Sequence, residues 1–406
     1  MNNGKGAARP AAFAFVFVTV MLDMLAIGII VPVLPKLVVE FAGGDAVEAT
    51  RVYGLFGTTW ALMQFVFSPV QGALSDRFGR RPVILISNFG LGLDYIVMAL
   101  APSLGWLFVG RVISGVTSAS ISTAFAYVAD VTAPEARAGR FGMLGAAFGV
   151  GFVVGPALGG LTGEIDPRLP FWIAAGLSLA NAMYGLFVLP ESLPPERRGP
   201  FAWRSANPVG ALALLRSKDG LLGLAGVNFL SMLAHAALPS VGVLYMMFRY
   251  GFSELTVGLT MAAVGVAAVV VQGALTARAV KRFGERTTLL AGLAFGVAGF
   301  AIMGLAPTGP IFWLGIPVMA VWGLVNPSSQ GLMSRRIGPQ QQGQLQGANS
   351  SLTGVANLIG PGLFTMTFAF AIGAAKDWGL PGAPYLVASA LLAVAIAVAL
   401  GETRDA

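Results

Sequence analysis

A chain of 406 residues is long enough for about three soluble domains. Its composition excludes that organisation, because 56% of its residues are hydrophobic and only 11% are charged, against roughly 25% charged in an ordinary soluble domain. The absence of cysteine and the single histidine argue against a disulfide framework, a thiolate nucleophile and a cysteine or histidine metal site. We therefore expect a membrane protein with no resident metal or cofactor.

Apolar runs of the length that a bilayer requires, about 20 residues, follow one another along the whole chain. The first lacks a small-residue cleavage site and is too long for a signal peptide, so we expect it to remain as a helix. The expected spans cover residues 12–34, 53–74, 82–101, 105–129, 142–162, 171–189, 221–247, 257–276, 287–306, 310–333, 345–372 and 383–400. The prediction is an all-α membrane protein of 12 transmembrane helices.

A polar, proline-containing stretch at residues 191–220 follows the sixth span. We expect it to be a flexible cytoplasmic linker between an N-terminal six-helix half, 1–190, and a C-terminal six-helix half, 221–406.

The basic residues predict the orientation of the chain. Nineteen of the 25 lysines and arginines fall on the side of the N-terminus, five fall on the other side and Arg111 lies inside a span. Positive charge collects on the cytoplasmic side, so both termini are expected there, in the bacterial inner membrane. The net charge of +7 thus reflects topology and gives no support to nucleic-acid binding.

The two halves carry the same landmarks at a nearly constant spacing. VQGAL at 70–74 recurs at 271–275, RFG at 77–79 recurs at 282–284, and Gly155-Pro156 recurs as Gly360-Pro361, at offsets of 201, 205 and 205 residues. Two parallel six-helix repeats are the architecture of a major facilitator transporter, in which substrate binds at the repeat interface near the membrane midplane.

The loop between the second and third spans, GALSDRFGRRP at 72–82, resembles the signature loop of the major facilitator superfamily. We expect Gly72 to allow a close helix approach, Asp76 to face a helix N-terminus and Arg80 to pair with Asp130. The resemblance implies that this cluster latches the two halves in one state of the transport cycle. The alternative is that these charges serve only to anchor the topology.

Glycines one turn apart in the fifth span form a small-residue ladder for close helix contact, and Pro156 adds a kink. The ladder consists of Gly151, Gly155 and Gly159. Packing alone would explain it, but it also resembles the antiporter motif of drug efflux proteins, which implies export rather than uptake.

Charged side chains inside spans are functional candidates by default. Asp23 falls near the midplane without an evident partner, and such a carboxylate suits a proton carrier. Asp94 and Arg111 fall at similar depth on consecutive spans and could pair, either structurally or for proton coupling. Fully ionised, the three sum to −1, so the cavity would favour a proton or a cationic substrate.

Several segments together resemble the tetracycline/proton antiporters, among them residues 22–35, 61–65, 74–82, 94–99 and 343–347. The resemblance implies that Asp23, Gln64, Asp94 and Arg111 are polar cavity and coupling residues. It also implies export of a magnesium–tetracycline cation in exchange for a proton, with Mg²⁺ travelling as cargo.

Two departures from that family put the substrate in question. The family carries a histidine in the eighth helix, where this chain has Ala268, and an aspartate in the ninth helix, where it has Gly296. His235, in the seventh span, is either a buried neutral imidazole or a relocated titrating or substrate-binding group. Other candidates for substrate hydrogen bonds in this half are Asn326, Asn349 and Asn357.

The leading hypothesis is a monomeric, proton-coupled exporter of an amphipathic drug, with a tetracycline as one candidate, working by alternating access. Uptake or facilitated movement of another small metabolite is the second hypothesis, and a non-transporting membrane sensor is the third. No nucleophile–base pair or phosphate loop is evident in the sequence, so we do not expect an enzyme.

Overall fold

The computed structural model describes residues 4–117, 120–199, 214–215, 220–338 and 341–402, and it is built almost entirely of helices. The α-helices are α1 Gly4–Ile30, α2 Leu34–Phe41, α3 Ala46–Phe78, α4 Arg80–Ala99, α5 Leu104–Thr117, α6 Ser120–Val131, α7 Pro134–Ile165, α8 Leu169–Val188, α9 Leu221–His235, α10 Ala237–Tyr250, α11 Glu254–Val270, α12 Thr276–Leu305, α13 Gly309–Ala320, α14 Val325–Arg335, α15 Gln342–Ile372 and α16 Ala383–Glu402. The shorter helical segments are η1 Pro195–Arg197, η4 Val271–Leu275, η5 Val321–Leu324 and η7 Lys376–Trp378.

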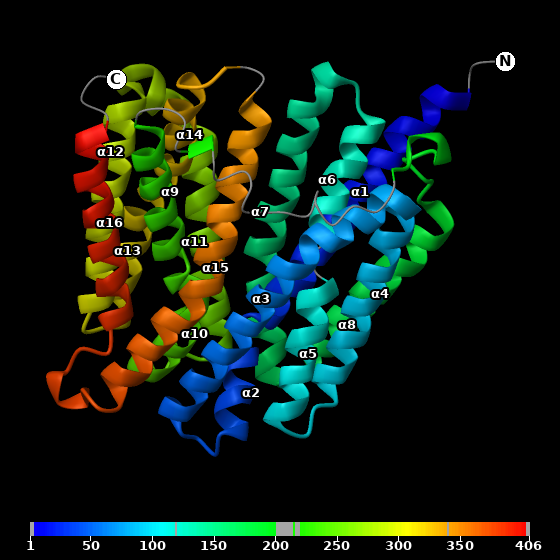
Figure 1. Ribbon diagram of the computed structural model, residues 1–406. Coiled ribbons are helices and arrows are strands. Elements are labelled where there is room, and N and C mark those ends of the chain that lie inside the picture. Colours follow the sequence, from blue (N-terminus) through cyan, green and yellow to red (C-terminus); the bar gives the residue numbers. More distant parts are fainter. Residues whose placement is uncertain (1–3, 118–119, 200–213, 216–219, 339–340, 403–406) are drawn as a thin grey trace. The chain divides into compact units, whose positions relative to one another are not determined.

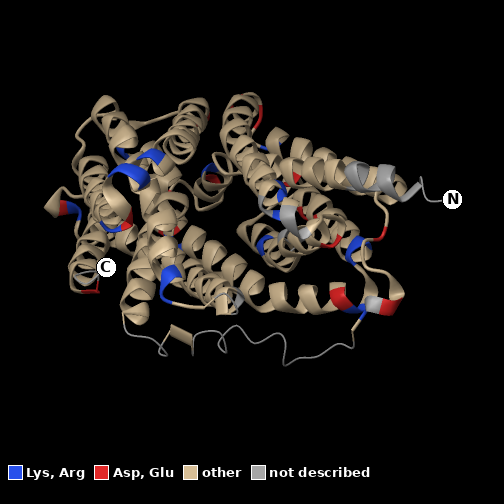
Figure 2. Ribbon diagram, turned by 90° about the horizontal axis from the view of Figure 1, so that it is seen from above, with Lys and Arg blue, Asp and Glu red and all other residues tan. Residues whose placement is uncertain are grey.

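Within the described residues, ten stretches are long and apolar enough to cross a membrane. One of them, Glu254–Leu305, has 52 residues and contains a non-helical turn at Gly284, so it accounts for two crossings. The 33-residue α3 adds another and is more polar than the rest, with Gln64 and Gln71 in its length. The chain is therefore a multi-pass membrane protein with the 12 helices that the sequence predicts. Figure 2 shows how few of the residues in the helices are charged, against the tan of all other residues.

Several expected spans are interrupted rather than continuous. The first divides at Pro32, between α1 and α2, and the seventh divides between α9 and α10. The tenth passes through the 3₁₀ segment η5 between α13 and α14, and the end of α11 widens into the π-helical segment η4. Irregular turns inside helices occur frequently at functional sites.

Packing divides the chain into two units. Unit 1 comprises Met1–Leu37, Thr59–Asn207 and Ser253–Ala262, and unit 2 comprises Val38–Thr58, Pro208–Phe252 and Ala263–Ala406. The units follow the two sequence halves except at the beginning of α3 and the beginning of α11. Most of the expected linker, 200–213 and 216–219, lies outside the described residues.

Each unit is a bundle of tilted helices in direct contact (Figure 1). In unit 1, α1 packs along α7 and α8, and α4 packs along α8 and α5. The aromatic side chains of Phe15 and Tyr127 are fully enclosed in this core. In unit 2, α12 lies beside α13 and α16, while α9 packs against α16 and α15.

Candidate functional site

Asp23 lies in the interior of unit 1, on α1, with only 4% of its surface exposed. The side-chain amide of Asn181, on α8, donates a hydrogen bond to its Oδ1 at 3.2 Å. The same amide nitrogen donates to the backbone oxygen of Thr19, and the Thr19 hydroxyl donates to Asn181 Oδ1 at 3.1 Å. Asp23 therefore has a partner that the sequence did not reveal. Because that partner is neutral, the carboxylate is oriented without being neutralised.

Asp94 and Arg111 come together as the sequence suggested. Asp94, on α4, is fully buried, and its Oδ2 lies 3.7 Å from Nη2 of Arg111 on α5. Neither Asp94 oxygen has a hydrogen bond from the described part of the chain, and Arg111 Nη2 instead contacts the Met98 sulfur at 2.8 Å. Gly110 permits this approach, because an added Cβ would lie 2.7 Å from Asp94 Oδ1.

A purely structural buried ion pair is stable only when hydrogen bonds satisfy its remaining lone pairs. The long, unsupported contact between Asp94 and Arg111 does not meet that condition. The arrangement is better suited to a pair that exchanges partners than to one that holds the fold.

Gln64, the remaining expected cavity residue in this half, is half-buried on α3. It follows Met63, which packs with Trp60 against Gly115 of α5. A second glutamine of α3, Gln71, donates a hydrogen bond to the backbone oxygen of Val116 on α5. The sequence analysis did not single out Gln71.

The glycine ladder of α7 makes the close helix contact that was predicted. A Cβ on Gly155 would lie 2.7 Å from the Cα of Gly28, and a Cβ on Gly151 would lie 2.5 Å from the Cβ of Met24, both on α1. Gly159 is pressed against the backbone of Ile29. The ladder thus allows the backbones of α1 and α7 to touch over two turns, on the helix that carries Asp23.

The same part of α7 also packs against the beginning of α11 within unit 1. Gly258 packs against the backbone of Pro156, and Gly160 packs against the backbone of Glu254. The Glu254 side chain is almost buried and forms an ion pair with Lys36.

The signature loop between α3 and α4 is organised around Arg80. Its Nη1 contacts Asp76 Oδ1 at 2.6 Å and the Ser75 hydroxyl at 2.6 Å, and its Nε contacts Asp130 Oδ2 at 3.2 Å. The predicted pairing of Arg80 with Asp130 is present, and the cluster lies within unit 1.

One expectation for this loop is wrong. The carboxylate at the helix N-terminus is Glu191 rather than Asp76: its oxygens accept hydrogen bonds from the backbone N–H groups of Arg80 and Arg81 at 2.9 and 3.3 Å. Free N–H groups at a helix start attract such an anion. Within unit 1, an added Cβ on Gly72 would meet no heavy atom of the described residues within 4 Å.

The second repeat contains the same ion pair with its charges exchanged. At an offset of 205 residues, Arg80 corresponds to Glu285 and Asp130 corresponds to Arg335. Arg335 Nη2 lies 3.1 Å from Glu285 Oε1 in unit 2, matching the 3.2 Å pair of unit 1. Gly79 and Gly284, which precede the first partner in each repeat, both have positive φ, 106° and 79°. The repeat therefore preserves the contact but not the sign of its members.

His235 lies at the break between α9 and α10, at a position where the residue is exposed. Proline at position 239 has no N–H, so the His235 carbonyl loses its normal helical partner four residues on. At the break, Ala236 packs against Gly360 of α15. Interrupted helices of this kind carry the binding sites of many transporters.

Trp322, in η5, lies beside His235, with ring centroids 5.7 Å apart. Its indole N–H donates to the Ser231 hydroxyl at 3.1 Å, which fixes the ring. The same ring occupies the space beside Gly296, where an added Cβ would lie 2.9 Å from Trp322 Cδ1. The position at which the antiporters carry an aspartate is thus closed by an indole, and the sequence analysis missed Trp322.

The asparagines predicted for substrate contact in this half have different surroundings. Asn349 is buried and its Oδ1 accepts a hydrogen bond from Asn228 at 3.2 Å. Asn326 is exposed and accepts from Gln330 at 3.1 Å, while Asn357 is exposed on α15. The structure does not gather these residues around His235 through any contact that the described residues show.

Fold, repeat and buried charges together define a membrane transporter built from two six-helix repeats. A family model described as Major Facilitator Superfamily matches residues 16–361. The chain is 38% identical over 381 residues to the tetracycline resistance protein, class C, of Escherichia coli, covering 93% of both proteins. It is 34% identical over 395 residues to the class D protein of Salmonella ordonez, covering 97% of this chain and 96% of that protein.

Solved structures support the same assignment. The human organic anion transporter MFSD10 (TETRAN) superposes with a TM-score of 0.70 at 26% identity, over 96% of this chain and 99% of that one. The chain therefore belongs to the Major Facilitator Superfamily and, within it, to the family of the tetracycline resistance proteins.

Proposed function

We propose that this protein exports tetracycline-class compounds, as Mg²⁺ complexes, across the bacterial inner membrane in exchange for protons. The observation that carries the proposal is the buried acidic set of unit 1, Asp23 and the Asp94–Arg111 pair, in a chain 38% identical to a tetracycline resistance protein. Both termini face the cytoplasm, and the monomer works by moving residues 1–190 against 221–406 around the linker 191–220.

The net charge of the buried set explains how a proton and a cationic substrate can compete. With both aspartates and Arg111 ionised, the set holds one negative charge, which one proton or one monovalent cation neutralises. Asp23 is the favoured carrier, because its only hydrogen bond among those described here comes from a neutral amide. Protonation of Asp94 would instead release Arg111, which lies 3.7 Å away.

The second repeat supplies recognition rather than charge. His235 presents an exposed ring next to the broken helix, backed by the buried indole of Trp322, which Ser231 holds in place. Polycyclic, partly aromatic substrates pack favourably on such surfaces, and aromatic pairs contribute about 0.5–1.5 kcal/mol beyond burial. Gln64 on α3 and the exposed asparagines Asn326 and Asn357 offer further hydrogen-bonding groups.

The Arg80–Asp76–Asp130 cluster and its charge-exchanged counterpart, Glu285–Arg335, act as the conformational latch. The first cluster joins α3, α4 and α6 within unit 1, and the second joins α12 and α14 within unit 2.

A drug-susceptibility panel in an efflux-deficient bacterial host tests the proposal. Expression of the wild-type chain should raise the inhibitory concentration of tetracyclines, while Asp23→Asn, expressed to the same level, should not. Protection against a different drug class alone would show export but overturn the substrate assignment. Protection by Asp23→Asn equal to that of the wild type would overturn the role of Asp23.

A further inference from the structure

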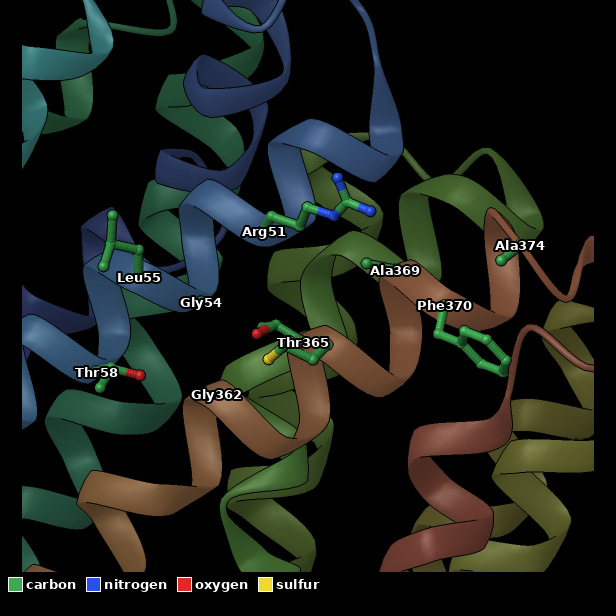
Figure 3. Close-up of a pocket in the computed structure, with 10 residues that line it drawn as sticks. Arg51, Gly54, Leu55, Thr58, Gly362, Thr365, Ala369, Phe370 and Ala374 are labelled. Carbon is green, nitrogen blue, oxygen red and sulfur yellow. The ribbon is translucent and has the colours of Figure 1, made fainter.

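A groove of about 540 Å³ opens between the first half of α3 and the last half of α15, within unit 2 (Figure 3). Its volume falls in the range of roughly 300–1,000 Å³ that is typical of small-molecule sites. Its walls are mostly apolar: Leu55, Met366 and Phe370 line it, with 56%, 69% and 52% of their surfaces exposed.

The groove has a floor where the two helices touch. Gly54 packs against the side chain of Thr365, and Gly57 packs against Pro361. Thr365 donates its hydroxyl to the Pro361 carbonyl at 2.6 Å, so its hydroxyl is not an unpaired donor. The contact therefore leaves a smooth hydrocarbon channel on the helix surfaces rather than a polar site.

A single cation stands at one end of this channel. Arg51 lines the groove one turn before Leu55, and Figure 3 shows it at the opposite end from Thr58. Seven helical residues separate Arg51 from Thr58, a rise of about 10 Å, against a hydrocarbon depth of about 15 Å per leaflet. The surface ion pair of Arg51 with Glu48, at 3.9 Å, is of the weak exposed type, and one carboxylate does not use the five donors of a guanidinium.

The far wall of the groove ends beside an exposed tryptophan, Trp378. Phe370 makes an edge-to-face contact with Trp378, ring centroids 5.9 Å apart, and Trp378 is 71% exposed. Exposed tryptophans at helix ends are typical of the membrane–water interface. Arg51 and Trp378 thus mark the headgroup level on α3 and after α15, with the apolar channel running from them toward the bilayer centre.

We propose that this groove binds one anionic glycerophospholipid, with its phosphate on Arg51 and an acyl chain along Leu55, Met366 and Phe370. The occupant is a lipid because the groove joins one cation to a hydrocarbon channel along membrane-spanning helices. It is anionic because the recognising group is a guanidinium, which pairs with phosphate through two parallel hydrogen bonds. The lining of the groove does not include Asp23, Asp94 or His235, and the proposal does not depend on what the protein exports.

Native mass spectrometry of the full chain in neutral detergent tests this, with phosphatidylglycerol and phosphatidylethanolamine as probes. The wild type should retain more phosphatidylglycerol than phosphatidylethanolamine. Arg51→Gln should weaken phosphatidylglycerol binding about fivefold, the factor for about 1 kcal/mol per basic residue at an anionic surface. Arg249→Gln, the matched control on α10, should leave binding unchanged.

Two further variants separate headgroup from chain recognition. Glu48→Gln removes the competing carboxylate and should strengthen phosphatidylglycerol binding, whereas Thr58→Phe fills the groove and should weaken both lipids. Equal retention of the two lipids by the wild type, or wild-type binding by Arg51→Gln, would overturn the proposal. Because Arg51 is a surface residue, Arg51→Gln decides the matter even if Thr58→Phe does not fold.

Discussion

The contact of α7 with α1 allows a direct test, because α7 carries glycines in two different settings. In Gly155→Ala the new Cβ would lie 2.7 Å from the Gly28 Cα and 3.0 Å from the Leu25 backbone oxygen. Real Cβ atoms essentially never come closer than 3.0 Å, and both neighbours are backbone, so no rotamer change relieves the clash. The helices must separate, and overpacking of this kind costs about 1–3 kcal/mol.

Gly145→Ala is the matched control on the same helix. Its Cβ would meet no heavy atom within 4 Å among the residues described, so only the intrinsic helix preference changes. Alanine gains roughly 0.5–1 kcal/mol over glycine inside a helix, and both variants receive that gain. The difference between them therefore isolates the packing cost, about 1–3 kcal/mol in favour of Gly145→Ala.

The assay is thermal unfolding of both variants in the same detergent, followed by scanning fluorimetry, with tetracycline transport measured in parallel. Gly145→Ala should unfold at or above the wild-type temperature, and Gly155→Ala should unfold below it with reduced transport. Equal unfolding temperatures for the two variants would refute the reasoning that backbone contact between α1 and α7 requires glycine.

Three further predictions concern unit 2. Glu285→Arg alone should lower the unfolding temperature, because it places two arginines together. Adding Arg335→Glu should recover about 0.5–1 kcal/mol of coupling energy in a double-mutant cycle. Purely additive effects of the two substitutions would contradict the pairing. His235→Ala should weaken substrate binding, measured by fluorescence titration. His235→Phe should retain most of the substrate affinity, because it keeps a ring next to Trp322. Equal loss of affinity in both variants would count against a ring contact. Gly296→Asp should destabilise the protein by about 1–3 kcal/mol, because its Cβ would collide with the Trp322 indole. Thermal unfolding measures this, and an unfolding temperature of the variant equal to that of the wild type would be inconsistent with that packing.

Much of this fold could be predicted from hydropathy and repetition alone. Spans of about 20 apolar residues are a strong signal because lipid leaves the backbone few alternatives to a helix. The repeated Gly155-Pro156 and Gly360-Pro361 fixed the correspondence of the halves. The interruptions were less visible, although Pro239 indicates the break after His235.

The candidate site could be predicted only in part. Charged residues inside spans stand out in a sequence, so Asp23, Asp94 and Arg111 were found directly. Neutral partners do not stand out: Asn181 is one amide in an apolar helix, and only the structure shows that it donates to Asp23. Trp322 was missed for the same reason. A tryptophan in an apolar span is common, and only the structure shows that this one fills the space beside Gly296.

The ion pair of the second repeat could have been predicted from the sequence. Comparing position 80 with 285 and position 130 with 335 shows opposite charges at each pair of equivalent positions. Comparing the repeats for identical residues overlooks this ion pair, because the second repeat keeps the interaction but exchanges the acidic and the basic residue. The misplaced role of Asp76 has another cause: the carboxylate that reaches the start of α4 comes from Glu191, more than 100 residues away in sequence.

Proton movement in everted membrane vesicles tests the central claim most directly. Vesicles from cells expressing the chain are acidified inside by respiration and monitored with a pH-sensitive dye. Adding tetracycline with Mg²⁺ should release protons from wild-type vesicles, with uptake of the drug, and should release none from vesicles carrying Asp23→Asn at equal expression. Drug uptake without proton release, or identical proton release by wild type and Asp23→Asn, would contradict proton exchange through this carboxylate.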